Sequence, residues 1–395
     1  MVESVAPRKG LSMKITALKT FLVPPRWLFL KIETDAGISG WGEPVLEGRA
    51  ATLAALIDEV SDLLIGADPT KINDIWQMIY RNGCYRGSAV LMSAISGIDQ
   101  ALWDITGKFH NAPVHALLGG AQRDRIRCYG WIGGDRPEGL IAGAKLAQAR
   151  GFNAAKMNIC EELPIVASHA QIDTIVVRLF ELRAAMGPGF DLAFDFHGRV
   201  HAPMAHVLLR ELAPLRPLFI EDAVAPGQIE AAAALQASTA IPLVLGERVH
   251  DRSVFKQIFE ARAARVINPD PSHVGGITET VKLAHVAETY DVALAPHCPL
   301  GPIALAACLQ VDALCHNAFI QEQSLGIHYN APGNDLMDYL TPGGRFDFVD
   351  GCLMIPNGPG LGIEVDEAFV IKQAAIGHRW RAPVWRHSDG AVAEW

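Results

Sequence analysis

The chain has 395 residues, of which 50% are hydrophobic and 19% are charged, and this composition is typical of a globular protein with a large core. The net charge of −9 argues against a surface that binds nucleic acid, and no basic run with interleaved aromatic residues is present. No apolar run reaches the length of a membrane span, so neither nucleic acid nor a membrane is an expected partner.

Residues 1–12 are polar and contain no apolar segment of the kind found in secretory signals, so we expect them to form an N-terminal extension. The seven cysteines are scattered, odd in number and never spaced as C-x-x-C. This usage favours reduced thiols in a cytoplasmic protein over a disulfide framework or a zinc site. Cys298 follows His297 directly, but neighbours in a strand point to opposite faces, which argues against Cys298 as a nucleophile.

The first part of the chain is predicted to be a capping domain of mixed α and β structure over residues 13–125. Residues 14–23, 27–34 and 38–41 read as antiparallel strands, with a hairpin turn before the third. Residues 87–108 carry an apolar stripe at helical spacing and form the clearest predicted helix. Buried aspartates within it are expected to be hydrogen-bond or salt-bridge partners rather than catalytic groups.

From residue 126 onwards, short apolar runs alternate with helical stretches, which is the pattern of parallel βαβ units. We therefore predict an α/β fold in which residues 126–340 form a (β/α)8 barrel, of the TIM type. The length of the chain exceeds the ~250 residues of a bare barrel and supports a second domain. Residues 341–395 are predicted to return to the capping domain, where three tryptophans of the tail, Trp380, Trp385 and Trp395, would pack.

Polar residues close the successive apolar runs of the predicted barrel. Asp195, Glu221 and Glu247 end three runs at a constant interval of one strand, one helix and two loops. Further runs end on other polar residues, namely Lys156 and Asn158 upstream and Asp270, His297 and Glu322 downstream. Because a (β/α)8 barrel carries its active site at the C-terminal ends of its strands, these side chains are predicted to meet there.

The three carboxylates at the barrel mouth suit a hard divalent cation such as Mg²⁺, which prefers oxygen ligands. No cysteine or paired histidine joins the set, which argues against zinc. A Mg²⁺ ion with open positions can chelate a substrate carboxylate and stabilise the enediolate formed when a base removes the α-proton. The sequence therefore predicts a Mg²⁺ site on Asp195, Glu221 and Glu247.

Two histidines are the candidate bases. Asp270 is expected to fix the tautomer of His297 and raise its basicity. His197 lies two residues after Asp195, which would place both on one side of an extended segment, opposite His297 in an eight-strand ring. One imidazole would abstract the α-proton and the other would protonate a leaving hydroxyl, which is β-elimination of water. Lys156 would neutralise the substrate carboxylate, and Glu322 would share a proton with its other oxygen.

These motifs resemble those of the enolase superfamily, and within it the mandelate racemase subgroup. The resemblance extends from residue 13 to residue 395 and is carried by Asp195-Phe196-His197-Gly198, Phe219-Ile220-Glu221, Gly246-Glu247-Arg248, Pro269-Asp270, Ala295-Pro296-His297-Cys298-Pro299 and Glu322. Long runs in the predicted loops, such as Pro24-Pro25-Arg26-Trp27 and Trp131-Ile132-Gly133-Gly134-Asp135-Arg136-Pro137, are similar to those of sugar-acid dehydratases in this subgroup.

The resemblance implies Mg²⁺ on the three carboxylates, His297 as the base with Asp270 behind it, and His197 as the acid that expels the 3-hydroxyl. It implies a sugar-acid substrate, a 2-keto-3-deoxy product and a homo-oligomeric protein. In such enzymes the N-terminal domain caps the barrel and supplies specificity loops. The expected substrate-binding residues are Arg26, Trp27, Glu47 and Asn158.

Two departures from the subgroup pattern bear on the reaction. Asn158 stands where racemases carry the second lysine of Lys-x-Lys, which disfavours racemisation or epimerisation of a sugar acid. Asp222 follows Glu221 where a glutamate is usual, and the sequence leaves open whether this loosens the metal site. Dehydration of a different aldonic or aldaric acid also stays open. A barrel that binds metal and sugar acid without turnover would require a missing catalytic group, and none is missing.

Overall fold

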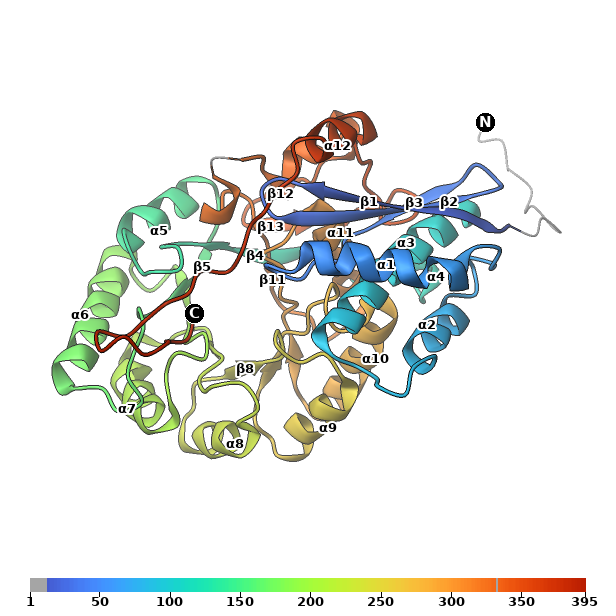
Figure 1. Ribbon diagram of the computed structural model, residues 1–395. Helices are drawn as coiled ribbons and strands as arrows, with labels where there is room; N and C mark the ends of the chain where they lie inside the picture. Colours follow the sequence, from blue (N-terminus) through green and yellow to red (C-terminus); the bar gives the residue numbers. More distant parts are fainter. Residues whose placement is uncertain (1–12, 332) are drawn as a thin grey trace.

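The computed structural model describes residues 13–331 and 333–395, and it shows an N-terminal α+β domain beside a (β/α)8 barrel (Figure 1). The predicted extension over residues 1–12 lies outside the described residues. Within the described ranges, no helix is both long enough and apolar enough to cross a bilayer.

The N-terminal domain is an antiparallel three-stranded sheet with helices packed on it. The sheet has the order β1 (Ile15–Val23), β2 (Trp27–Thr34) and β3 (Ser39–Gly42). Its helices are α1 (Ala50–Leu64), α2 (Ile72–Arg81), α3 (Ala89–His110) and the short α4 (Val114–Leu117). Helix α3 lies so close to β3 that a Cβ on Gly42 would collide with the carbonyl oxygen of Gly97. Glycine at both positions therefore permits this contact between the helix and the sheet.

Eight parallel strands follow in sequence order, each paired with the next along the chain. The last of them pairs with the first, and a bridge between Leu294 and Ala318 completes the ring, so the predicted barrel is confirmed. The strands are β4 (Arg125–Trp131), β5 (Ala154–Asn158), β6 (Asp191–Asp195), β7 (Ile220–Glu221), β8 (Leu243–Leu245), β9 (Val266–Ile267), β10 (Ala293–Leu294) and β11 (Gln321–Glu322).

Helices cover the outside of the barrel, as Figure 1 shows for most of the ring. They are α5 (Leu140–Ala149), α6 (His169–Met186), α7 (Ala202–Leu212), α8 (Ile229–Ser238), α9 (Arg252–Glu260), α10 (Gly276–Thr289) and α11 (Pro302–Leu314), with a 3-10 turn, η1 (Ala213–Leu215), after α7.

Several strands are shorter than the apolar runs that predicted them. Asn158, Asp195, Glu221 and Glu322 are the last residues of their strands, as expected, but Glu247, Asp270 and His297 lie beyond the ends of theirs. Pro269 and Pro296 precede two of these residues, and proline has no N–H to donate to a strand ladder. Gly246 precedes the third with φ +151°, a conformation that L side chains rarely adopt. These three side chains therefore project from loops just above the barrel.

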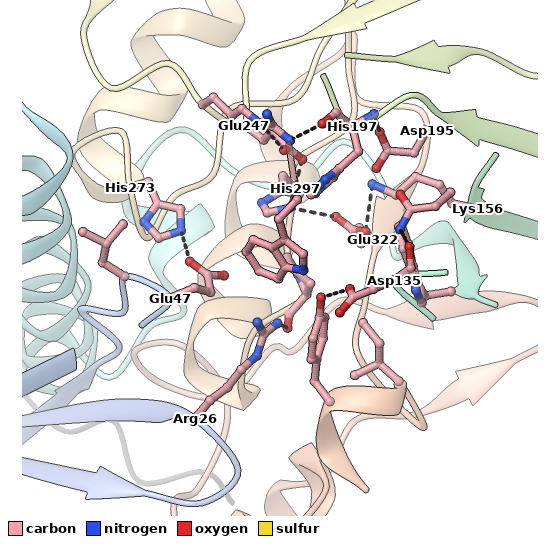
Figure 2. A pocket seen from close by; sticks show the side chains of 18 of the residues that line it. Arg26, Glu47, Asp135, Lys156, Asp195, His197, Glu247, His273, His297 and Glu322 are labelled. Atoms are coloured by element: carbon pink, nitrogen blue, oxygen red, sulfur yellow. Dashed lines mark hydrogen bonds and ion pairs between the residues drawn. The ribbon is translucent and has the colours of Figure 1, made fainter. Parts of the chain in front are cut away.

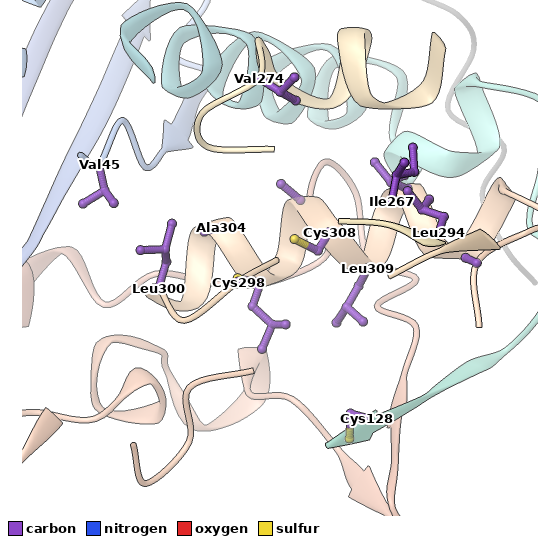
Figure 3. Packing of buried hydrophobic residues seen from close by; sticks show 14 of the residues in the cluster. Val45, Cys128, Ile267, Val274, Leu294, Cys298, Leu300, Ala304, Cys308 and Leu309 are labelled. Atoms are coloured by element: carbon purple, nitrogen blue, oxygen red, sulfur yellow. The ribbon is translucent and has the colours of Figure 1, made fainter. Parts of the chain in front are cut away.

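Helix α11 is buried along its whole length, and its apolar side chains pack with residues of the loop that follows His297 (Figure 3). Cys298 and Cys308 lie in this core, where burial raises the pKa of both thiols. All seven cysteines are free. Because Cys298 points into the core, its neighbour His297 faces the barrel mouth and Cys298 does not.

Side chains of the N-terminal domain satisfy the first backbone N–H groups of two barrel helices. The Glu43 carboxylate accepts hydrogen bonds from Gly301 N (2.7 Å) and Ala304 N (2.9 Å) at the start of α11. Ser96 Oγ and Asp99 Oδ2, both on α3, accept from Gly275 N (2.8 Å) and Thr278 N (3.1 Å) at the start of α10. Neither helix has a side-chain N-cap of its own, so the two domains are joined by capping across their interface.

After β11 the chain leaves the barrel through 3-10 turns, η2 (His328–Asn330), η3 (Leu336–Tyr339) and η4 (Pro342–Gly344). The hairpin of β12 (Phe348–Val349) and β13 (Cys352–Met354) then pairs with β4, and α12 (Glu367–Ala374) packs beside β1. An ion pair joins Glu367 to Lys31 of the N-terminal sheet at 2.7 Å.

The prediction that the whole tail packs on the N-terminal domain is wrong in part. Beyond α12 the chain crosses to the barrel (Figure 1), where Trp385 and Trp395 contact barrel residues. Trp380 still contacts Arg26 of the N-terminal domain, whereas Trp385 and Trp395 find arginine and aromatic partners at the barrel mouth.

The capping by Asp99 generates a prediction about stability and pH. Burial raises the pKa of Asp99 to about 7, since it outweighs the hydrogen bonds from Thr278, and Asp99 Oδ1 has no hydrogen-bond partner. A carboxyl group whose pKa is raised in the folded state stabilises the fold fully below its unfolded pKa and loses this contribution as pH rises through the folded value. We expect the Tm of the wild type to fall more between pH 5 and pH 8.5 than the Tm of Asp99→Asn.

Thermal unfolding followed by circular dichroism measures how the Tm of each protein changes with pH. The exposed Asp58 provides the matched control, because Asp58→Asn makes the same charge change outside the interface. Equal pH slopes for the wild type and Asp99→Asn would show that Asp99 does not titrate in this range.

Candidate active site

A cavity of about 320 Å³ opens at the C-terminal end of the barrel, beneath the loops of the N-terminal domain (Figure 2). All of the predicted site residues except Glu221, Asp270 and Trp27 line it. The first two lie directly behind lining residues, as the contacts below show. The barrel thus brings together side chains that are far apart in the sequence.

Three carboxylates form a compact cluster at the base of the cavity. Oxygen atoms of Asp195, Glu221 and Glu247 all lie within 4.8 Å of one another. Burial raises the pKa of Asp195 to about 6 and raises that of Glu221 well above its usual value. Burial would also raise the pKa of Glu247, but His297 and Arg248 hold it well below its usual range. Buried like charges at this spacing require positive charge nearby, and their oxygen donors suit a hard divalent cation.

Lys156 supplies one positive charge beside the cluster. Its Nζ lies 2.8 Å from Glu221 Oε2 and 2.9 Å from Glu322 Oε1, and the side chain is almost wholly buried. Burial alone would lower the pKa of Lys156, but the two carboxylates outweigh it and raise the pKa well above the usual value. Lys156 is therefore a permanent cation that holds two carboxylates in place and still borders the cavity.

Asn268 was not predicted as a site residue, yet it joins two members of the cluster. Its Nδ2 donates to Glu221 Oε1 (2.8 Å), and its Oδ1 accepts from the backbone N–H of Glu247 (3.2 Å). It follows β9, directly before Pro269-Asp270, so its position at a strand end was the signal that could have identified it. Asn268 orients the carboxylates from behind.

Asp222, whose side chain is one methylene shorter than the usual glutamate, lies beside an arginine of the site. Asp222 Oδ2 and Glu247 Oε1 lie 2.9 Å and 3.0 Å from Arg248 Nε, although only the second contact has the angle of a hydrogen bond. Arg248 also donates to the carbonyl oxygen of His197 (2.9 Å). The aspartate therefore still reaches the arginine that links a member of the carboxylate cluster to the His197 loop.

His297 and Asp270 form the expected pair. His297 Nδ1 lies 2.8 Å from Asp270 Oδ2, and Nε2 lies 3.2 Å from Glu247 Oε2 and faces the cavity. A proton on Nδ1 that is donated to Asp270 leaves Nε2 as the basic atom. Burial alone would lower the pKa of His297, but Glu247, Glu322 and Asp270 raise it well above its usual value.

His197 reaches the cavity in a different way from the one expected. Strand β6 ends at Asp195, and His197 has φ +51°, so the two residues do not share one face of an extended segment. The bend is held by a hydrogen bond of 2.6 Å from His197 N to Asp195 Oδ1. His197 Nδ1 is buried without a hydrogen-bond partner. Burial and nearby Arg248 lower the pKa of His197 well below its usual value.

The predicted substrate-binding residues separate into two groups. Arg26, Glu47 and Asn158 line the cavity, with the Arg26 guanidinium 3.9 Å from the ring centre of Tyr329. Trp27 does not line it, and its predicted substrate contact is wrong. Consecutive residues in a strand point to opposite faces, and Trp27 is buried against Phe29 and Tyr339 in the N-terminal core.

Other residues that border the cavity gave no strand-end signal because they lie on loops. Tyr329 donates a hydrogen bond to Asp135 Oδ1, and His328 Nε2 lies 3.4 Å from the same oxygen. Burial alone would raise the pKa of Asp135, but these partners lower it to about 2. Near Glu47, His273 Nε2 lies 3.6 Å from its Oε2. His250 and Trp395 also border the cavity from loops, and Trp131 borders it as the last residue of β4.

Comparisons with known proteins agree with this geometry. Residues 140–369 match the family model for enolase C-terminal domain-like proteins, and residues 3–119 match that for the N-terminal domain of mandelate racemase/muconate lactonizing enzymes. The chain is 56% identical to D-galactonate dehydratase of Ralstonia nicotianae and 54% identical to that of Pectobacterium atrosepticum. Both matches cover 97% of this chain and 100% of the relative.

Crystal structures of more distant relatives have the same fold. A mandelate racemase/muconate lactonizing enzyme from Sulfitobacter sp. superposes with a TM-score of 0.86 at 28% identity, over 95% of this chain and 99% of that one. A mandelate racemase/muconate lactonizing enzyme-like protein from Rubrobacter xylanophilus superposes with a TM-score of 0.85 at 28% identity. The match covers 93% of this chain and 98% of that one. The chain therefore belongs to the mandelate racemase/muconate lactonizing enzyme family of the enolase superfamily, as a hydro-lyase.

Proposed function

We propose that this protein is a Mg²⁺-dependent dehydratase that converts D-galactonate to 2-dehydro-3-deoxy-D-galactonate and water. The observation that carries the proposal is the pairing of His297 with Asp270 at 2.8 Å beside three clustered carboxylates, in a cavity that His197 also borders. The identity of more than half of all aligned residues with D-galactonate dehydratases of two species supports the choice of substrate.

Asp195, Glu221 and Glu247 are the residues that would hold the Mg²⁺ ion. When bound, the ion supplies positive charge that attracts the substrate carboxylate and stabilises the negative charge that develops there on deprotonation. Glu322, fixed by Lys156 and by the backbone N–H of Cys298 (3.0 Å), borders the same part of the cavity. Lys156 opposes the charge of the substrate carboxylate, and Glu322 shares a proton with it.

Because Glu247 raises the pKa of His297, the role of base requires that a cation at the carboxylate cluster oppose that charge and leave the imidazole neutral. His297 Nε2 then removes the proton from C2 of the sugar acid, and the Asp270 carboxylate stabilises the imidazolium that results. His197 then gives a proton to the 3-hydroxyl, which leaves as water. Because burial and Arg248 lower the pKa of His197, this role requires the substrate's negative charge nearby to favour the imidazolium. The two histidines follow the ends of β6 and β10, strands that stand four apart in the ring, and so act on opposite sides of the substrate.

Asn158 supports dehydration over racemisation. Its Nδ2 donates to the carbonyl oxygens of Gly134 (3.3 Å) and Asp135 (3.1 Å), so it is engaged with the β4 loop. Racemisation in this subgroup uses a lysine at this position as a base on one face of C2. An amide cannot act as a base at neutral pH, so Asn158 cannot take that role.

The substrate assignment predicts selective turnover of one sugar acid. We expect purified protein with Mg²⁺ to form a 2-keto-3-deoxy acid from D-galactonate, and from other C5 and C6 aldonic and aldaric acids much more slowly. Semicarbazone absorbance measures this product. Faster turnover of another acid would contradict the assignment of D-galactonate as substrate but would agree with the reaction class. An epimer as the product would contradict dehydration.

The separate roles of the histidines predict different losses in two variants. In D₂O, we expect His297→Asn to lose both exchange of the C2 proton and dehydration, by about 10²-fold or more. His197→Asn should lose dehydration and retain exchange, because only the later proton donation fails. Proton NMR of D-galactonate follows both reactions, and the exposed His169 provides His169→Asn as the matched control. Exchange that persists in His297→Asn would exclude His297 as the base.

The metal assignment predicts a loss of affinity that does not depend on turnover. We expect Glu221→Gln to weaken Mg²⁺ binding by more than about 100-fold, since even outer partners of metal ligands contribute about 10- to 100-fold. Isothermal titration of metal-free protein measures the dissociation constant. Glu230→Gln, an exposed site on α8, makes the same charge change and should bind as the wild type does. Unchanged affinity in Glu221→Gln would refute the site.

A further inference from the structure

The last residues of the chain form a segment that no catalytic role above uses. Residues 378–395, here called the C-terminal strap, leave the end of α12 and run across the barrel (Figure 1, dark red). The strap folds back on itself near its end, with hydrogen bonds from His387 N to Ala391 O (2.9 Å) and from Ala393 N to Trp385 O (3.0 Å). This turn directs the final residue back toward the cavity.

Two tryptophans attach the strap to the rest of the molecule. The ring of Trp385 is contacted by two arginine side chains, with the guanidinium carbons of Arg136 and Arg199 at 4.5 Å and 4.4 Å from its centre. The Trp380 ring lies 5.1 Å from the guanidinium carbon of Arg26 and 5.9 Å from the ring of Tyr329. Cation–π contacts of this kind are strongest when partly shielded from water, as they are here. The strap is therefore attached both to the barrel and to the loop that carries Arg26.

Trp395 is the strap residue that lines the cavity. Its ring lies 6.0 Å from the ring of His197, nearly perpendicular to it at 84°, and 5.9 Å from the ring of Trp380. Its Nε1 atom is buried and has no hydrogen-bond partner of normal geometry, although Asp135 lies close to it. A buried indole N–H without a partner has lost its hydration, and a ligand that accepts a hydrogen bond would restore it.

We propose that Trp395 is a substrate-contacting specificity residue of this site. Its indole packs against the C–H groups of the sugar-acid carbon chain beyond C3, and its N–H donates to a hydroxyl of that chain. The position beside His197 places the ring near the carbon that would lose its hydroxyl. An extended polyhydroxy acid presents both surfaces that an indole can bind, apolar C–H groups and hydroxyl acceptors. The proposal rests on the proposed function for the identity of the substrate.

Substitutions of Trp395 test the proposal through steady-state kinetics with D-galactonate and Mg²⁺. We expect Trp395→Ala to lower kcat/KM by about 10- to 100-fold, chiefly by raising KM, because the lost contact is made to a part of the substrate that does not react. Trp395→Phe keeps an aromatic ring without the N–H, and its kcat/KM should lie between those of the wild type and the alanine variant. Trp385→Ala should raise KM as well, since it detaches the strap without touching the cavity. Val384→Ala, an exposed change on the same strap, should stay within about twofold of the wild type.

A purely structural role for Trp395 would lower the Tm and leave KM unchanged, and this result would overturn the proposal. So would a loss confined to kcat, because it would place the effect at the reacting carbons. If the wild type dehydrates a different sugar acid, the same variants are compared on that acid. A wild type without activity on any sugar acid would refute the proposed function, and the substrate role of Trp395 with it, whereas an active wild type with an unaffected Trp395→Ala refutes the role alone.

Discussion

The concentration of negative charge at the barrel mouth is the constraint on which the rest of the structure depends. Asp195, Glu221 and Glu247 place oxygens within 4.8 Å of one another in a region with little access to water. Such an arrangement is stable only when cations and hydrogen-bond donors stand in fixed positions around it. Lys156, Arg248 and His297 supply the charge, and the Nδ2 of Asn268 supplies a neutral donor to Glu221.

The N-terminal domain contacts the barrel beside this charge cluster. Carboxylates of Glu43 and Asp99 accept hydrogen bonds from the first turns of α11 and α10, the helices that flank the His297 loop. A shift of either helix would move His297 relative to Asp270 and to the carboxylate cluster. The placement of His297, the proposed base, therefore depends on side chains of the other domain that lie outside the cavity.

The residues proposed to contact the substrate, and those that pack against them, come from segments that lie far apart in the sequence. Arg26 lies in the turn between β1 and β2, Tyr329 follows the last barrel strand, and Trp380 belongs to the strap, yet their side chains contact one another. The proposed reacting groups lie at or within a few residues of the barrel strand ends, whereas these contacts lie farther from the barrel strands. Variation in the loops can change which sugar acid fits and leave the proton chemistry untouched.

The sequence by itself determined the barrel, the capping domain, the three clustered carboxylates and the pairing of His297 with Asp270. Regular βα spacing places strand ends on one rim, and residues near those ends must meet. Only the tertiary structure decided the positions of side chains in bends and loops. From local patterns we wrongly predicted that His197 lies on an extended strand and that Trp27 contacts the substrate. We also wrongly predicted that the whole tail packs on the N-terminal domain. Backbone bends and loop contacts depend on residues distant in the chain, and the periodicity of a strand does not predict which distant residues these are.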